Sequence, residues 1–250
     1  MGEREELIAG WHAVTAALRA PALSVREVWL QQGRQDRRSQ ELQALAAERA
    51  VPVRLHDPKT LDERAKGLNH QGVIALAGAA KVLSEDDLDS LLDGLGSEAP
   101  FLLVLDGVQD PHNLGACLRS ADAAGVHAAI VPRDRAVGLT PTARKTSAGA
   151  AEVLPFIQVT NLARCLRALR ERGIWVVGLA GEASESLFEV DLKGPLALVL
   201  GAEDKGMRRL TREHCDRLAR IPMRGSVESL NVSVATAVCL FEAARQRISP

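Results

Sequence analysis

Six nearly uninterrupted apolar runs lie in the second part of this 250-residue chain and constrain its fold more than any other feature. They are Phe101–Leu105, Ala128–Val131, Val153–Val159, Ile174–Leu179, Leu196–Leu200 and Leu218–Ile221. A strand that is buried on both faces of a parallel sheet has such a continuous pattern, whereas a half-exposed strand alternates. The segments between them predict helices at Asn113–Ala124, Asn161–Arg172, Arg208–Arg217 and Leu230–Arg247. The alternation predicts a doubly wound α/β domain with a largely parallel sheet.

The first 80 residues predict a smaller α/β unit. Helices are expected at Trp11–Arg19, Ser39–Arg49 and Leu61–Lys66, and strands at Arg26–Leu30, Val53–Leu55 and Gly72–Ala77. Asp57 followed by Pro58 is a good helix start signal before the third helix.

The segment 81–98 divides these two regions. It contains six acidic residues and one basic residue, and Gly94 and Gly96 precede Pro100. We therefore expect an acidic linker with one short helix around Leu88, Leu91 and Leu92. The expected domains are residues 1–80, the linker 81–98, and residues 99–250.

Composition excludes several classes of protein. An apolar content of 46% with 25% charged residues is typical of a globular protein. No apolar run approaches the roughly 20 residues of a membrane span, and the start of the chain is charged, unlike a signal peptide, so we expect a cytoplasmic protein with no membrane partner. The four cysteines are scattered, and neither they nor the histidines have ligand spacing. We expect core cysteines and no metal site.

The net charge of -1 conceals a regional difference. Residues 1–80 carry 11 basic and 10 acidic residues, and residues 99–250 carry 19 and 16. Most of the basic residues are arginines, which bind phosphates and stack on bases. The charge pattern permits nucleic-acid binding, although a solvated mixed-charge surface would look the same.

Three polar loops follow predicted strands of the larger domain. They are Asp106–Gly115, Leu200–Met207 and Met223–Asn231. In parallel sheets, ligands bind beyond the carboxyl ends of the strands. The third loop also feeds a strongly apolar helix, whose first-turn amides would face a ligand in the loop.

Each loop also has a simpler interpretation. Asn113 could cap a helix after an ordinary turn, and Ser229 and Asn231 could cap the last helix. The segment Gly201–Gly206 lacks both the GxGxxG and the GxxxxGK[ST] spacing, which argues against a nucleotide-dependent oxidoreductase. The functional hypothesis depends on all three loops meeting at one edge of the sheet.

Together, the loops resemble the motifs of the SPOUT methyltransferases, in particular their SpoU (TrmH-type) branch. The matching segments are Asp106–Gly115 with Arg119, Leu198–Glu203 with Lys205 and Gly206, and Ile221–Met223 through Ser229–Ala235. The segments Gly10–Val14 and Asn69–Val73 resemble the small substrate-binding domain of the bacterial 23S rRNA guanosine-2'-O-methyltransferases in this branch. That domain is similar to kink-turn-binding ribosomal proteins.

The resemblance implies a deep trefoil knot near the C-terminus and S-adenosyl-L-methionine as cofactor. It also implies roles for individual residues. The cofactor would be lined by Gly201, Ile221, Met223 and Leu230. Catalysis and substrate placement would involve Asn113, Arg119, Glu203, Ser229 and Asn231.

The implied reaction methylates the ribose 2'-hydroxyl of RNA. Because that hydroxyl is a poor acid, the enzyme must align the transfer and help remove a proton. The resemblance implies Arg119 as the base, with a substrate phosphate as a possible assistant; the alternative is a phosphate clamp that only positions RNA. Glu203 could orient Arg119 or the amides at the helix start.

Two features depart from the usual pattern. Ala202 stands where the family often has Ser or Thr, and Asp204 stands where it often has Gly. The chain also has no Tyr and only 3% aromatic residues, so RNA recognition should depend on arginine, backbone and shape.

We expect an S-adenosylmethionine-dependent methyltransferase that acts on a guanosine of 23S rRNA. The alternatives are a tRNA guanosine-2'-O-methyltransferase and a non-catalytic RNA-binding ribosome-assembly factor. The last helix also has two apolar stripes, one with Val234, Val238 and Phe241 and one with Ala237, Leu240 and Ala244. One stripe suffices for the core, so the pattern, together with the resemblance, favours a homodimer through the C-terminal domain.

Overall fold

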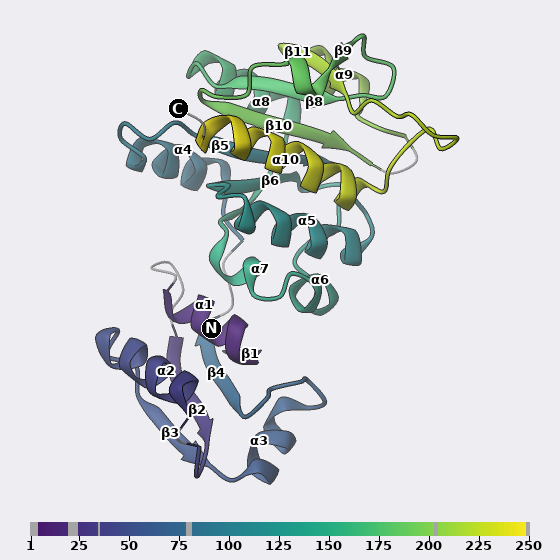
Figure 1. The fold of residues 1–250 in the computed structure, drawn as a ribbon. Coiled ribbons are helices and arrows are strands. Elements are labelled where there is room, and N and C mark those ends of the chain that lie inside the picture. Colours follow the sequence, from purple (N-terminus) through teal and green to yellow (C-terminus); the bar gives the residue numbers. More distant parts are fainter. Residues whose placement is uncertain (1–4, 20–24, 35, 79–81, 203–204, 249–250) are drawn as a thin grey trace. The chain divides into compact units, whose positions relative to one another are not determined.

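The computed structural model describes residues 5–19, 25–34, 36–78, 82–202 and 205–248. The chain divides into two compact units, each with its own sheet (Figure 1). The first unit comprises Met1–Lys81 and Ala148–Val153, and the second comprises Val82–Ser147 and Leu154–Pro250.

The first unit has a four-stranded sheet in the order β1-β4-β2-β3. Strand β4 is antiparallel to β1 and β2, whereas β2 and β3 are parallel. The elements of this unit are β1 (Glu5–Ala9), α1 (Trp11–Arg19), β2 (Val25–Gln31), α2 (Arg37–Glu48), β3 (Val53–His56), α3 (Pro58–Ala65), β4 (Val73–Gly78) and α7 (Ala150–Val153). The sequence predicts each of the first three helices and β2–β4, but not β1 or α7.

The sheet of the first unit is covered on both faces. Along β4, Val73 and Ala75 pack with residues of α1 and α2 in one core. Ile74, between them, packs on the opposite face against Leu61 of α3 and the partly buried Trp29. Because successive side chains of a strand point to opposite faces, β4 packs against α1 and α2 on one face of the sheet and against α3 on the other.

Aspartates begin two helices of the first unit. The side chain of Asp36 accepts from the amide of Ser39 and caps α2. Asp57 caps α3 by accepting from the amide of Thr60, and Pro58 is in the first turn. The predicted start signal is confirmed, and α3 begins three residues before the predicted Leu61 because the proline already belongs to it.

The second unit has a seven-stranded sheet in the order β7-β6-β5-β10-β8-β11-β9, and every strand pair in it is parallel. Its strands are β5 (Phe101–Asp106), β6 (Ala128–Pro132), β7 (Phe156–Val159), β8 (Trp175–Leu179), β9 (Glu185–Ser186), β10 (Leu196–Gly201) and β11 (Arg217–Arg220). Its helices are α4 (Glu85–Gly94), α5 (Pro111–Ala123), α6 (Pro141–Thr146), α8 (Leu162–Glu171), α9 (Arg209–Glu213) and α10 (Val232–Ile248), with a short 3-10 turn at Leu187–Glu189. The predicted parallel α/β architecture is confirmed.

Helices cover both faces of this sheet (Figure 1). Leu102 and Val104 of β5 belong to a core that also contains residues of α4 and α8. The helices α5 and α10 pack against each other, and Cys117 Sγ lies 3.3 Å from Thr236 Oγ1 between them. All six residues of β5 are buried, which explains why its sequence is apolar without alternation.

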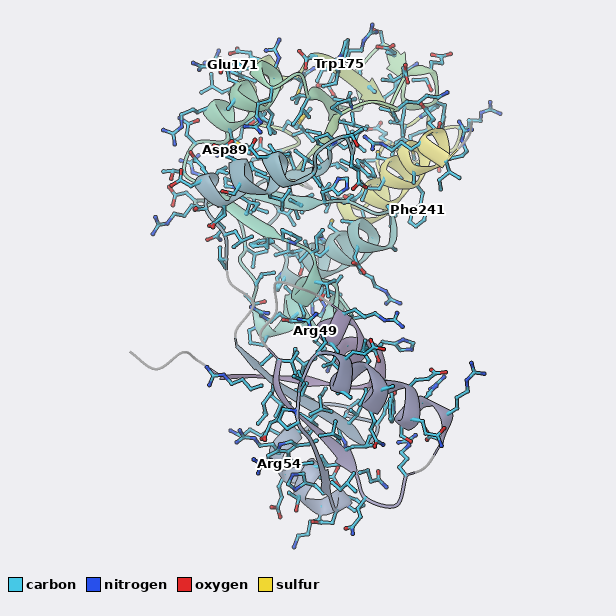
Figure 2. All side chains as sticks on the ribbon, turned by 90° about the vertical axis from the view of Figure 1, so that its left-hand side faces the viewer. Arg49, Arg54, Asp89, Glu171, Trp175 and Phe241 are labelled. Carbon is cyan, nitrogen blue, oxygen red and sulfur yellow. The ribbon has the colours of Figure 1, made fainter. Side chains whose placement is uncertain are left out.

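The acidic segment belongs to the second unit from Val82 onward, rather than forming a free linker. Helix α4 buries Leu88 and Leu92 in the core with α8. Asp86, Asp89 and Asp93 are exposed, as Figure 2 shows for Asp89, and Arg172 pairs with Asp89 and Asp93. The charge run therefore marks the polar face of an amphipathic helix.

All four cysteines are free thiols in the second unit, and Cys117, Cys165 and Cys239 are buried. Burial is the main cause that raises the pKa of Cys165, Cys215 and Cys239 to about 12. These thiols are therefore protonated at neutral pH.

Val153, which the sequence places in a strand, lies instead in α7, and β7 begins at Phe156. Within the described part of the chain, no helix is long and apolar enough to cross a membrane. The same residues contain no group of three or more His, Cys, Asp or Glu side chains placed to hold a metal ion.

Candidate active site

The three polar loops leave the same edge of the second unit's sheet. Strands β5 and β10 are parallel neighbours, and their last residues, Asp106 and Gly201, are paired in the register. Strand β11, which precedes the third loop, is parallel to β8, the other neighbour of β10. Since the strands are parallel, their carboxyl ends meet at one edge, as the sequence predicts.

Asp106 ends β5 with a carboxylate that is buried, and the neighbouring loop supplies its partner. One carboxylate oxygen accepts from the backbone amide of Arg208 at 2.8 Å. The other accepts from Arg208 Nε at 2.6 Å and lies 2.5 Å from Nη2. The side chain of Asp106 is 0% exposed and that of Arg208 is 41% exposed. This pair fixes the end of the second loop to the end of β5.

Gly201 is required by the loop that follows it. A Cβ at this position would overlap the backbone of Gly206 and Met207, so the loop returns directly over β10. Hydrogen bonds in both directions between Ala202 and Gly206 close the loop. Glu203, a predicted catalytic residue, lies outside the described residues.

The first loop turns into α5 through residues suited to a helix start. Gly107 has a φ of 93°, in the left-handed region that favours glycine. Asp110 caps α5 by accepting from the amide of His112, and Pro111 lies in the first turn. The N-cap of α5 is therefore Asp110 and not Asn113, as one interpretation of the sequence proposed.

Asn113 and Asn231 meet although they are 118 residues apart in the sequence. The Nδ2 group of Asn231 donates to Oδ1 of Asn113 at 3.0 Å. Asn231 also caps α10, because its Oδ1 accepts from the amide and the hydroxyl of Ser233 at 2.8 and 2.6 Å. The capping interpretation is therefore correct for Asn231, whose side chain also contacts Asn113.

Arg119 and Ser229 are exposed at different places. Arg119 follows Asn113 by six residues of α5, so it lies about 9 Å further along the helix axis and is rotated by roughly 120°. Ser229 lies in the loop before α10. The structure thus brings Asn113 and Asn231 into hydrogen-bond contact, while Arg119 lies almost two turns further along α5.

The third loop contains the remaining predicted cofactor residues. Ile221, Met223 and Leu230 are partly buried, whereas the residues between Arg224 and Ser229 are exposed. Residues 222–230 form no backbone–backbone hydrogen bond with any part of the chain that the structure describes. The loop thus combines partly covered apolar side chains with backbone polar groups that face solvent, which suits a ligand with an aromatic ring and a polar edge.

Two residues of this edge are absent from the predicted site, namely Asp106 and Arg208. A signal for them exists in the sequence, because Asp106 is the one charged residue in an otherwise apolar strand segment, Phe101–Asp106. A buried carboxylate requires a cationic or hydrogen-bonding partner. The sequence does not reveal which of the many arginines provides it.

Comparisons with known proteins agree with this geometry. A family model described as the SpoU rRNA Methylase family matches residues 100–241. A second, described as RNA 2'-O ribose methyltransferase substrate binding, matches residues 7–83.

Individual relatives match over nearly the whole chain. The 23S rRNA (guanosine-2'-O-)-methyltransferase RlmB of Pseudomonas aeruginosa is 58% identical over 97% of this chain and 97% of that protein. The RlmB protein of Shewanella oneidensis is 55% identical over 99% of this chain and 100% of its own length.

A solved structure is similar in fold. It is the SpoU methyltransferase AviRb from Streptomyces viridochromogenes in complex with the cofactor AdoMet, which is 25% identical. The match has a TM-score of 0.74 and covers 98% of this chain and 92% of that one.

Proposed function

Because this chain belongs to the SpoU rRNA methylase family, we propose that it transfers a methyl group from S-adenosyl-L-methionine to the ribose 2'-hydroxyl of a guanosine in 23S rRNA. The observation that carries this proposal is the meeting of three motif loops at one edge of the parallel sheet, where Asn231 binds Asn113. The whole-length similarity to the RlmB proteins supports the reaction and its rRNA substrate.

The cofactor site of this proposal lies along Gly201 and the third loop. Ile221 and Leu230 would contact the adenine, while backbone groups near Gly201 and Met223 would bind its polar atoms. The partly buried side chains and open backbone of the third loop fit such a molecule. When bound, S-adenosylmethionine supplies an electrophilic methyl group, so the protein needs no metal for activation.

The remaining residues act on the RNA side. Asn113 and Asn231 position the target ribose, and Ser229 lies close to Asn231 in the sequence at the start of α10. Arg119 binds the RNA near the 2'-oxygen and helps remove its proton, either directly or with a phosphate of the substrate. Glu203 would orient Arg119 or the amides at the helix start.

We also propose that the protein is a cytoplasmic homodimer with a C-terminal trefoil knot. Helix α10 buries one stripe, which includes Thr236, Cys239 and Leu240, but leaves Val234 49% and Phe241 51% exposed. Phe241 projects from α10 in Figure 2. A second copy of the chain would cover this stripe and bring the partner subunit's RNA within reach of Arg119. Static light scattering should give about twice the chain mass of 26.8 kDa, and a fully active monomer would refute the dimer.

The decisive experiment replaces Arg119 by alanine. Arg119→Ala should reduce methyl transfer from radiolabelled S-adenosylmethionine to protein-free 23S rRNA by at least a hundredfold. Its affinity for S-adenosylmethionine, measured by isothermal titration, should stay within twofold, because the guanidinium works on the RNA side. Arg119→Lys keeps the charge but loses the planar fork, so it separates charge from geometry.

Arg167→Ala is the matched control, since Arg167 is also exposed on a helix of the second unit, namely α8. It should methylate at the wild-type rate. Substantial activity of Arg119→Ala would disprove the catalytic role. If the wild-type protein bound rRNA without methylating it, the non-catalytic alternative would replace the proposal, and methylation of tRNA but not of rRNA would indicate the tRNA enzyme.

A further inference from the structure

A cavity of about 1010 Å³ opens on the first unit, away from the methyltransfer motifs in the sequence. It is lined by α3 and the turn that follows it, by the end of β2 and the residues after it, and by the start of α1 and α2. The lining residues are Trp11, Gln31, Arg34, Arg38, Pro58, Asp62, Gly67, Leu68, Asn69, His70, Gln71 and Gly72.

The turn at Gln71 shapes this cavity. Gln71 and Gly72 both have positive φ values, 50° and 86°. Two side chains from other parts of the unit hold the turn, because the carbonyl of Gln71 accepts from Trp11 Nε1 at 2.9 Å and from Arg34 Nη1 at 2.6 Å. The turn is therefore fixed before any ligand arrives.

His70 is part of the wall rather than a ligand-binding group. Its Nδ1 lies 3.0 Å from the amide of Gly72 and accepts from it. The proton of the neutral ring is then on Nε2, which donates to Asp62 at 2.9 Å. Both ring nitrogens of His70 are used inside the protein.

Arg34 provides a flat surface at the cavity. Its guanidinium stacks on the ring of Trp11, with 4.9 Å between the guanidinium carbon and the ring centroid. Its Nε donates to Asp36 at 2.6 Å, and its side chain remains 32% exposed. The guanidinium therefore lies over Trp11, and the exposed part of the Arg34 side chain lines the cavity. A planar cation held in this way can stack on an aromatic base.

The other polar groups suit a nucleotide better than a bare phosphate. Arg38 adds a second, exposed guanidinium, whereas Asp62 adds a carboxylate that would repel a small anion. Gln31 and Asn69 carry amides, which can both donate to and accept from the edge of a base. A base needs such mixed partners, and its phosphodiester needs a cation.

We propose that this cavity binds one unstacked nucleotide of the RNA substrate. Its base would stack on Arg34, its edge would meet the amides of Gln31 and Asn69, and its phosphate would pair with Arg38. Proteins recognise RNA in this manner at loops and bulges, where bases are already free of the stack. The inference rests on the proposed function in that RNA is the substrate, and it assigns the recognition of an unpaired nucleotide to this cavity.

The test uses the full-length protein and two RNA probes. One probe is a hairpin with an unpaired loop, and the other is a fully paired duplex of the same composition. Arg38→Gln and Arg34→Lys should each weaken hairpin binding about tenfold by fluorescence anisotropy, which is the usual effect of losing one stacked or clamped base. Both variants should bind the duplex as the wild type does.

Arg37→Gln is the control, because this substitution removes the same charge as Arg38→Gln, one residue earlier in α2. Its side chain is 90% exposed and pairs with Glu41, outside the cavity. Arg37→Gln should bind both probes like the wild type. An equal loss for Arg37→Gln and Arg38→Gln would show general electrostatic attraction and overturn the inference, as would hairpin binding that neither cavity variant changes.

Failure of the proposed function can be distinguished from failure of this inference. Methyl transfer to 23S rRNA by the wild-type protein tests the function, whereas the ratio of hairpin to duplex affinity tests the cavity. Unchanged S-adenosylmethionine binding and thermal unfolding in both variants would show that they are folded. Arg34→Lys could also disturb the turn at Gln71. Arg38 is exposed and does not hold that turn, so Arg38→Gln would still test whether the cavity binds an unpaired nucleotide.

Discussion

In the first unit, the turn at Gln71 is held by Arg34 and Trp11, which are 37 and 60 residues away in the sequence. In the second unit, Asp106 and Asn113 bind partners that are 102 and 118 residues away. The candidate RNA cavity therefore needs only contacts within one small unit, whereas the candidate methyltransfer site requires most of the larger unit to be folded. The two sites should therefore respond to substitution separately.

One glycine in each site allows the two sites to be compared by substitution, namely Gly201 at the methyltransfer site and Gly72 at the cavity. A side chain at Gly201 would overlap backbone atoms, which cannot move without shifting the loop. A Cβ at Gly72 would lie 2.6 Å from Arg34 Nη1 and 2.9 Å from Gln31 Oε1, which are ends of flexible side chains. The methyltransfer site should therefore tolerate a side chain at Gly201 less well than the cavity tolerates one at Gly72.

The largest effect is expected for Gly201→Val. Because the new side chain would displace Gly206 and Met207, S-adenosylmethionine affinity should fall by more than tenfold and methyl transfer should be lost. Isothermal titration measures the first effect and radiolabel transfer the second. Gly194→Ala is the control, since a Cβ there would have no neighbour within 4 Å. Wild-type affinity in Gly201→Val would mean that the loop can open without cost.

A smaller loss is expected for Asp106→Asn. The substitution places an NH₂ group against either the amide or the guanidinium of Arg208, donor against donor. The free energy of unfolding should fall by about 1 to 2 kcal/mol, because water partly screens Arg208. Urea unfolding measures this change. Asp110→Asn should leave stability nearly unchanged, since asparagine is also a good N-cap, and equal losses for both variants would argue against a special role of the buried pair.

A still smaller effect is expected for Gly72→Ala in the first unit. Its φ of 86° costs an alanine roughly 1–2 kcal/mol locally, and Arg34 must shift. Hairpin RNA affinity should fall several-fold while S-adenosylmethionine affinity stays constant, as anisotropy and isothermal titration would show. A fall in cofactor affinity would contradict the separation of the two sites.

The smallest effect is expected for alkylation of the cysteine thiols, all of which lie in the second unit. Because burial raises the pKa of Cys165, Cys215 and Cys239 to about 12 from 9.0, the folded protein should react little with iodoacetamide at pH 8. Between pH 9 and 12, only the thiols of the unfolded chain ionise. The contribution of these thiols to the free energy of unfolding is therefore fully present below pH 9 and is lost as the pH rises towards 12.

Labelling also distinguishes the units. Gly201→Val should increase labelling of Cys215, because the Cys215 and Met207 side chains both lie against Gly178. Gly72→Ala should not change it. Mass spectrometry after brief alkylation would show both results, and labelling that rises in Gly72→Ala would indicate that the units unfold together.

Much of the fold follows from local patterns. Continuous apolar runs predict the parallel strands, and Asp57 with Pro58 predicts the start of α3. The predictions fail where local preference is weak or tertiary contacts decide. Strand β1 has only five residues, two of them acidic, and β9 has two residues and pairs only at the sheet edge. The acidic segment resembles a linker because Leu88 and Leu92 find their core partners only in strands and in α8, which come later in the sequence.

The site is predictable to a similar degree. The motif loops and the Asn113–Asn231 contact agree with the resemblance to the family, and the roles assigned to Arg119, Ser229 and the cofactor residues remain predictions. The Asp106–Arg208 pair could not be predicted, because many arginines compete for one carboxylate and the sequence does not state which loop returns over β10. The cavity at Gln71 is likewise invisible in the sequence, since three separate segments form it.

The double use of Asn231 restricts what its side chain can offer. Its Oδ1 has two lone pairs, and the amide and hydroxyl of Ser233 occupy both. Its Nδ2 has two hydrogens, of which Asn113 takes one. Among the residues that the structure describes, the residual capacity of Asn231 is thus a single donor, whose orientation the helix cap sets. Such a group can bind a ribose or phosphate oxygen through a lone pair, but it cannot accept the hydroxyl's proton, so that proton must leave by a path that does not include Asn231.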